Sequence, residues 1–197
     1  MKIGLYFGSF NPIHHGHLII ANYTLQHTDL DQIWLVISPQ NPFKPSKGLL
    51  NEYHRLHLAK LALDGETRLK AVDIEFRLPM PSYTIDTLTY LEEKHPQHQF
   101  SILMGSDSFQ NLDKWKNASV IMSRFMIYVY ERPGSPIRTD LPVQYQALRA
   151  PLLEISATRV REMIREGKSI RYLVPDSVKE EIERNHYYRP LKDPSQQ

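Results

Sequence analysis

The 197-residue sequence contains no cysteine. This absence excludes disulfide bonds, thiolate metal sites and a cysteine nucleophile. Long hydrophobic runs are missing too, because no segment approaches the roughly 20 apolar residues that a membrane-spanning helix needs. No signal-peptide pattern precedes the first strand-like segment, so we expect a cytoplasmic protein that makes no use of membranes.

An excess of charge of one sign is also absent. The net charge is +2 and the isoelectric point is about 8.7, which is too mild for a non-specific nucleic-acid binder but compatible with a local basic site for a small polyanion. The hydrophobic fraction of 41% and the charged fraction of 23% are ordinary for a globular protein and argue against disorder. The length fits one domain, expected over residues 1–190, and the polar tail 191–197 is expected to be mobile.

Strand signals and helix signals alternate along the chain. This alternation predicts βαβ units and a mainly parallel sheet. Right-handed crossovers would put helices on both faces, giving a doubly wound, Rossmann-like α/β fold with further helices at the C-terminus. The predicted strands are 2–8, 32–38, 70–76, 99–105, 123–130 and 151–155, and the predicted helices are 18–25, 52–63, 84–94, 157–166 and 175–185.

The first predicted junction between a strand and a helix carries histidines. The strand ends at Gly8, where the backbone can approach a ligand, and His14 and His17 precede the helix. Ligands of open α/β sheets bind at such junctions, because helix N-termini present free N–H groups and a positive dipole end. Two added imidazoles suit an anion with several oxygens, such as a polyphosphate. A zinc site is the alternative, but no carboxylate or cysteine lies at a familiar spacing, so no metal site is predicted.

This stretch resembles the signature of the nucleotidyltransferase superfamily, a glycine-bearing turn followed by His or Thr, any residue, Gly and His. Its longer form is similar to the nicotinate-nucleotide adenylyltransferase branch, with Asn11 where that branch usually has Asp. The resemblance implies that His14 and His17 are catalytic. It implies ATP binding by both histidines and by residues of the turn, namely Gly8, Ser9 and Phe10.

A second predicted junction between a strand and a helix lies near the C-terminus. Ser156 is a suitable N-cap for the helix, and the free N–H groups, hydroxyls and guanidinium of this segment could hold phosphate oxygens. The segment resembles the superfamily's motif Ile-Ser-x-Thr-x-x-Arg. The resemblance implies that Ser156, Thr158 and Arg161 bind ATP and that Arg161 acts in catalysis. An ordinary capped amphipathic helix is the alternative.

Three further segments resemble parts of the same family. Gly105 ends a predicted strand, and Asp107 just after it can accept hydrogen bonds from a ribose, so the family's Gly-x-Asp pattern implies that both bind ATP. The resemblance places Trp115 against the nicotinate ring, with burial in the core as the alternative. Thr84 is a suitable helix cap in a segment like the family's Ser-Tyr-Thr, and that helix N-terminus could hold a carboxylate of the mononucleotide. Lys44 resembles a basic residue turned toward phosphates, although most loop lysines are simply solvated.

Together these resemblances imply an adenylyltransferase with ATP and nicotinate mononucleotide as its partners. The implied products are nicotinate adenine dinucleotide and pyrophosphate, in NAD biosynthesis. Mg²⁺ is expected to arrive with ATP, without dedicated protein ligands. A homo-oligomer is left open. The alternatives are another acceptor, such as nicotinamide mononucleotide or phosphopantetheine, and a nucleotide-binding regulator without turnover.

Overall fold

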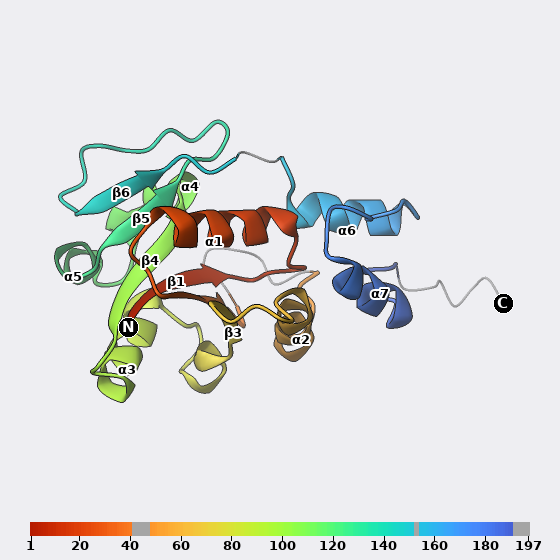
Figure 1. The fold of residues 1–197 in the computed structure, drawn as a ribbon, viewed down its shortest axis with the longest axis horizontal. Coiled ribbons are helices and arrows are strands. Elements are labelled where there is room, and N and C mark those ends of the chain that lie inside the picture. The colour runs from red at the N-terminus through yellow and green to blue at the C-terminus, as the bar shows by residue number, and fades with distance from the viewer. Residues whose placement is uncertain (41–47, 152–153, 191–197) are drawn as a thin grey trace.

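A computed structural model describes residues 1–40, 48–151 and 154–190 (Figure 1). Lys44 and the tail 191–197, both named in the sequence predictions, lie outside these residues. Within the described part, six strands form one sheet with the order β3-β2-β1-β4-β5-β6, and every neighbouring pair is parallel. This is the strand order of the doubly wound dinucleotide-binding fold, so the predicted fold class is confirmed.

The strands are β1 (Lys2–Gly8), β2 (Gln32–Ile37), β3 (Leu69–Val72), β4 (Gln99–Gly105), β5 (Ile127–Tyr130) and β6 (Tyr145–Leu148). The α-helices are α1 (His15–His27), α2 (Glu52–Ala62), α3 (Thr84–Lys94), α4 (Ser106–Phe109), α5 (Ala118–Arg124), α6 (Ala157–Arg165) and α7 (Asp176–Arg184). Two 3-10 helices are η1 (Ile74–Arg77) and η2 (Leu112–Lys114). No helix within the described residues is both long and apolar enough to cross a membrane.

The sheet separates two hydrophobic clusters. Helices α1, α2, α6 and α7 contribute to the cluster on one face, and α3, α4 and α5 contribute to the cluster on the other. Successive strand residues point to opposite faces, so that the neighbours Leu5 and Tyr6 of β1 belong to different clusters. Both residues are almost fully buried, as expected for a central parallel strand covered on each side.

Three predicted strands differ from the structure. The predicted strand 70–76 ends at Val72, and its second half forms η1. The predicted strand 123–130 begins only at Ile127, because residues up to Arg124 belong to α5. Of the strand predicted at 151–155, residues 152–153 lie outside the described residues, and Pro151, Glu154 and Ile155 belong to no strand. The sixth strand of the described part is Tyr145–Leu148, whose middle residues are exposed and polar or small, so its hydrophobic signal is weak. Pro151 lacks the N–H group that a strand ladder requires.

Candidate active site

The carboxyl ends of the parallel strands meet at one edge of the sheet. Strand β1 ends there at Gly8, β4 at Gly105 and β5 at Tyr130. The strand order reverses between β1 and β4, and open parallel sheets bind ligands outside the carboxyl ends at such a switch point. The predicted site residues Gly8 and Gly105 therefore flank the position that the fold itself favours for a ligand.

The loop between β1 and α1 is packed tightly around aromatic rings. Phe10 is buried and adopts a left-handed conformation with φ +44°. Its ring lies edge-on to the ring of His17, with 4.9 Å between the centroids. If Gly8 carried a side chain, its Cβ atom would stand 3.0 Å from the Phe10 ring. A Cβ on Gly16 would stand 3.0 Å from the ring of His14. A side chain at either glycine would therefore crowd a neighbouring ring, which would have to move by a few tenths of an ångström.

His14 and His17 form a stacked pair at the N-terminus of α1. Their ring centroids are 3.7 Å apart, and the backbone N–H of His14 donates to Nδ1 of His17 at 3.3 Å. A neutral His17 thus carries its proton on Nε2, which can donate a hydrogen bond. His14 is buried, and its Nδ1 has no hydrogen-bond partner within the described residues. Burial, with smaller contributions from Arg132 and His15, lowers the pKa of His14 from 6.5 to about 4, so its imidazole is neutral at pH 7.

The C-terminal motif reaches the same place. Ser156 is the N-cap of α6, as predicted, and its Oγ accepts the backbone N–H of Arg159 at 3.1 Å. Arg161 donates from Nη2 to the hydroxyl of Thr158 at 3.2 Å and from Nη1 to the carbonyl of Asn11 at 2.7 Å. Its buried Nε has no partner within the described residues, and burial lowers the pKa of the guanidinium. Figure 1 shows α6 beginning beside the start of α1, so the fold brings the two motifs next to each other.

The ends of β4 and β5 add an ion pair that the sequence analysis did not identify. Asp107 lies in the first turn of α4, and its carboxylate pairs with Nη1 of Arg132 at 3.3 Å. The backbone N–H of Arg132 donates to the hydroxyl of Ser106 at 2.9 Å. A Cβ on Gly105 would stand 2.6 Å from the Asp107 carboxylate, so a larger residue here would displace that side chain. The signal for Arg132 was its position just after a strand and before the turn signal Pro-Gly.

The segments of Thr84 and Trp115 lie next to each other. Thr84 is the first residue of α3, but the N-cap is Tyr83, so the predicted capping by Thr84 is wrong by one residue. Trp115 is half-buried. Its neighbour Lys116 places Nζ 2.9 and 3.0 Å from the carboxylate oxygens of Asp86 and 4.8 Å from the ring centroid of Tyr83. These contacts join the N-terminal turn of α3 to the segment that carries the tryptophan.

Two buried charges were also missed by the sequence analysis. Glu75 is 2% exposed and accepts hydroxyl hydrogen bonds from Ser82 at 2.8 Å and Thr87 at 3.0 Å. Burial raises the pKa of this carboxyl group against the effect of the hydroxyls. Glu75 fell on the polar face of a predicted alternating strand, so no pattern marked it. Arg55 does carry a signal, because it precedes the buried Leu58 and Ala59 by one turn of α2.

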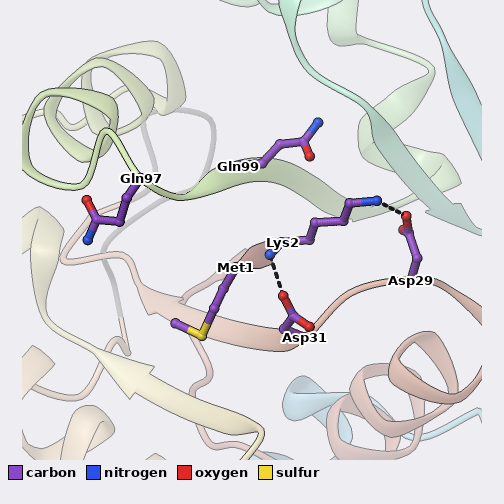
Figure 2. A pocket seen from close by; sticks show the side chains of 6 residues that line it. All are labelled: Met1, Lys2, Asp29, Asp31, Gln97 and Gln99. Carbon is purple, nitrogen blue, oxygen red and sulfur yellow. Dashed lines mark hydrogen bonds and ion pairs between the residues drawn. The ribbon is translucent and has the colours of Figure 1, made fainter.

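The hollow drawn in Figure 2 lies at the opposite edge of the sheet. Its residues come from the beginnings of β1 and β4 and from the loop before β2, and they are Met1, Lys2, Asp29, Asp31, Gln97 and Gln99. A second open hollow extends from there past Tyr128. Neither contains a predicted site residue. Within the described residues, no group of three or more histidine, aspartate or glutamate side chains could hold a metal ion.

With this fold, a match of residues 5–163 to the cytidylyltransferase-like family model makes the protein a nucleotidyltransferase. Probable nicotinate-nucleotide adenylyltransferases from Cytophaga hutchinsonii and Flavobacterium johnsoniae are 50% and 48% identical to it. The alignments cover 95% and 96% of this chain and 98% and 100% of those proteins. The chain belongs to the nicotinate-nucleotide adenylyltransferase family.

A solved structure supports the fold independently. Plasmodium falciparum nicotinic acid mononucleotide adenylyltransferase, complexed with NaAD, matches with a TM-score of 0.80 at 21% identity. The match covers 95% of this chain and 97% of that one. At this level of identity the likeness concerns the arrangement of strands and helices.

The burial of neutral His14 predicts a pH dependence of stability. Between pH 6.5 and about 4 the unfolded chain binds a proton at this residue and the folded chain does not. The free energy of unfolding should therefore fall as the pH drops through this window, by up to about 3 kcal/mol from His14 alone. Denaturant unfolding at a series of pH values measures this effect. In His14→Asn the free energy of unfolding should fall less than in wild type as the pH drops from 6.5 to about 4. His27→Asn, at the exposed end of α1, should follow the wild-type curve; parallel curves for His14→Asn and wild type would contradict the assignment.

Proposed function

We propose that the protein transfers AMP from ATP to nicotinate mononucleotide, giving nicotinate adenine dinucleotide and pyrophosphate in NAD biosynthesis. The contact of Arg161 with Asn11 carries this proposal, because it unites the N-termini of α1 and α6 in one site. Two helix N-termini, two imidazoles and a guanidinium are suited to a triphosphate. The names of relatives that are 50% and 48% identical support the choice of acceptor.

The triphosphate would lie across the N-termini of α1 and α6. His14 would donate a hydrogen bond as a neutral imidazole, His17 would donate from Nε2, and Arg161 would supply the positive charge. The backbone of Gly8, Ser9 and Phe10 would approach the phosphates from the end of β1. In α6, the hydroxyls of Ser156 and Thr158 already accept hydrogen bonds, but their hydrogens can still be donated to phosphate oxygens.

The adenosine would extend toward the end of β4. There the backbone at Gly105 is closely packed, and Asp107 offers carboxylate oxygens to the ribose hydroxyls. Arg132, paired with Asp107 in this structure, helps to hold that carboxylate in place. Lys44, outside the described residues, is proposed as an additional phosphate ligand.

The reaction needs little covalent help from the protein. An oxygen of the mononucleotide phosphate attacks the α-phosphorus of ATP in line, a new P–O bond forms, and the bond from the α-phosphorus to the bridging oxygen breaks. The attacking group is already an anion, so no general base is required. Pyrophosphate leaves with the Mg²⁺ that entered as part of the Mg·ATP substrate. Catalysis then consists of holding the reacting atoms and stabilising charge on the phosphoryl oxygens.

The acceptor would be recognised where α3 meets the Trp115 segment. The indole of Trp115 would stack on the pyridine ring and fix its plane. The N-terminal turn of α3, beginning at Thr84, presents backbone N–H groups and a positive dipole end to the nicotinate carboxylate. The nearby carboxylate of Asp86 is paired with Lys116, which limits its repulsion of an acidic ligand. The geometry therefore favours an acid over a neutral amide.

A pyrophosphate-release assay with ATP and three separate acceptors tests this function. We expect release with nicotinate mononucleotide and at least roughly tenfold lower kcat/KM with nicotinamide mononucleotide, equivalent to about 1.4 kcal/mol. Phosphopantetheine should give no turnover. Equal use of the acid and the amide would contradict the carboxylate site. Absence of release with all three acceptors would favour a regulator that binds nucleotides without turnover.

Two substitutions should separate the two halves of the site. Arg161→Ala should raise KM for ATP at least roughly tenfold and alter KM for the mononucleotide little, because charge-assisted contacts to phosphate are lost. Trp115→Ala should raise KM for the mononucleotide and alter KM for ATP little, because the stacking surface for the pyridine ring is lost. Steady-state kinetics with each substrate varied in turn measures both effects. An unchanged KM for ATP in Arg161→Ala would make this arginine structural, and an unchanged mononucleotide KM in Trp115→Ala would assign that tryptophan to the core.

A further inference from the structure

Arg55 is fully enclosed in the protein although it carries a positive charge. Its exposed fraction is 0%, and among the residues that the structure describes its guanidinium donates only to backbone carbonyl oxygens. Nε donates to Leu50 at 2.7 Å, Nη1 to Ser9 at 2.6 Å and Ser38 at 2.8 Å, and Nη2 to Pro39 at 2.9 Å. These carbonyls belong to the segments after β1, after β2 and before α2. One side chain thus joins three segments at the carboxyl edge of the sheet.

We propose that Arg55 is a positioning residue for ATP, which acts by fixing the β1–α1 loop and, through it, Arg161. This inference rests on the function proposed above. Arg55 does not touch the substrate in this account. Its role is to hold the backbone that does.

The first step of the argument concerns the peptide bond between Ser9 and Phe10. The carbonyl of Ser9 accepts the hydrogen bond from Arg55. In a planar trans peptide the C=O and the following N–H point in opposite directions, so the N–H of Phe10 is directed away from the guanidinium. Phe10 adopts φ +44° in this position, and its ring contacts His17. Anchoring one carbonyl therefore fixes a strained residue that packs directly against the histidine pair.

The second step connects Arg55 with Arg161. The carbonyl of Leu50 accepts from Arg55, and the N–H of Leu50 donates to Oδ1 of Asn11 at 3.1 Å. The amide of Asn11 also donates to the carbonyl of Gly48 at 3.1 Å, and the carbonyl of Asn11 accepts from Arg161 at 2.7 Å. A continuous series of hydrogen bonds thus runs from the buried arginine to the guanidinium proposed to bind ATP. Loss of its first member should displace its last.

The third step concerns the charge itself. Within the described residues no salt bridge to Arg55 is formed, and burial lowers the pKa of its guanidinium despite the smaller, opposite effects of Tyr188 and Glu52. Burying a cation without an anionic partner is costly, and an apolar side chain would fill the same space on α2 at a lower electrostatic cost. The planar guanidinium offers five N–H groups in a fixed arrangement, which suits several carbonyls at once. We therefore attribute its presence to the geometry of the loops.

The chain provides a matched control for the structural contribution. Arg68 also donates to two backbone carbonyls, from Nε to Asp31 at 3.1 Å and from Nη2 to Leu30 at 2.8 Å. These carbonyls precede β2, at the amino edge of the sheet. Arg68→Met thus removes a comparable carbonyl-binding arginine at a distance from the proposed site.

The experiment compares wild type, Arg55→Met, Arg55→Lys and Arg68→Met. Isothermal titration with Mg·ATP, thermal unfolding, and KM for each substrate are measured for every variant. We expect Arg55→Met to weaken ATP binding at least roughly tenfold with the mononucleotide KM changed less than about twofold. Arg55→Lys should lie between wild type and Arg55→Met, because an ammonium cannot reproduce the planar set of donors. Arg68→Met should lower the unfolding temperature and leave both substrate constants unchanged.

Two results would overturn the inference. One is an ATP affinity in Arg55→Met that equals that of Arg68→Met, which would make Arg55 a structural residue only. The other applies if Arg55→Met does not fold: in that case, an Arg55→Lys variant that binds ATP as tightly as wild type would overturn the inference. The titration is independent of the acceptor: if wild type binds ATP but releases no pyrophosphate with any acceptor, the proposed function fails while the role of Arg55 is still decided by ATP affinity.

Discussion

The 2.7 Å hydrogen bond from Arg161 to the carbonyl of Asn11 joins segments that are 150 residues apart in the sequence. It connects α6 with the loop that enters α1, so two helix N-termini converge at the same edge of the sheet. The fold makes this possible because all six strands described here are parallel and their carboxyl ends lie together. Without that contact, each motif would be an ordinary turn before a helix. With it, the phosphate-binding groups proposed for the protein share one location.

The electrostatics of the site are local and do not depend on the net charge. The whole chain carries only +2, yet Arg161, Arg132 and the enclosed Arg55 lie near the carboxyl edge. His14 is kept neutral by burial, so it can offer one N–H donor without adding charge. Helix N-termini contribute partial positive charge from fixed backbone groups. A preorganised arrangement of this kind is what in-line phosphoryl transfer requires, because the developing charge is met by donors that are already in place.

The sequence was sufficient for the fold class, the main alternation of strands and helices, the first junction between a strand and a helix, and the N-cap Ser156, but no described residue of the strand expected before Ser156 belongs to a strand. Those depend on local signals such as Gly8, the histidine pattern and the N-cap Ser156. The edge strand β6 was misplaced because its exposed residues have little hydrophobic pattern. Glu75 was missed because its partners Ser82 and Thr87 are brought to it only by the tertiary fold. The carbonyl contacts of Arg55 could not be predicted for the same reason, since backbone oxygens from three segments leave no trace in residue types.

The central claim is that the imidazole pair at the start of α1 stabilises charge during adenylyl transfer. The most direct measurement is kcat of His17→Ala, with circular dichroism to confirm folding. Loss of the Nε2 donor should lower kcat by about two orders of magnitude or more, on the order of 3 kcal/mol. His15→Ala is the matched control, since its backbone N–H bond to Leu173 is retained, and it should stay near the wild-type rate. A folded His17→Ala variant with near-wild-type kcat would contradict the account.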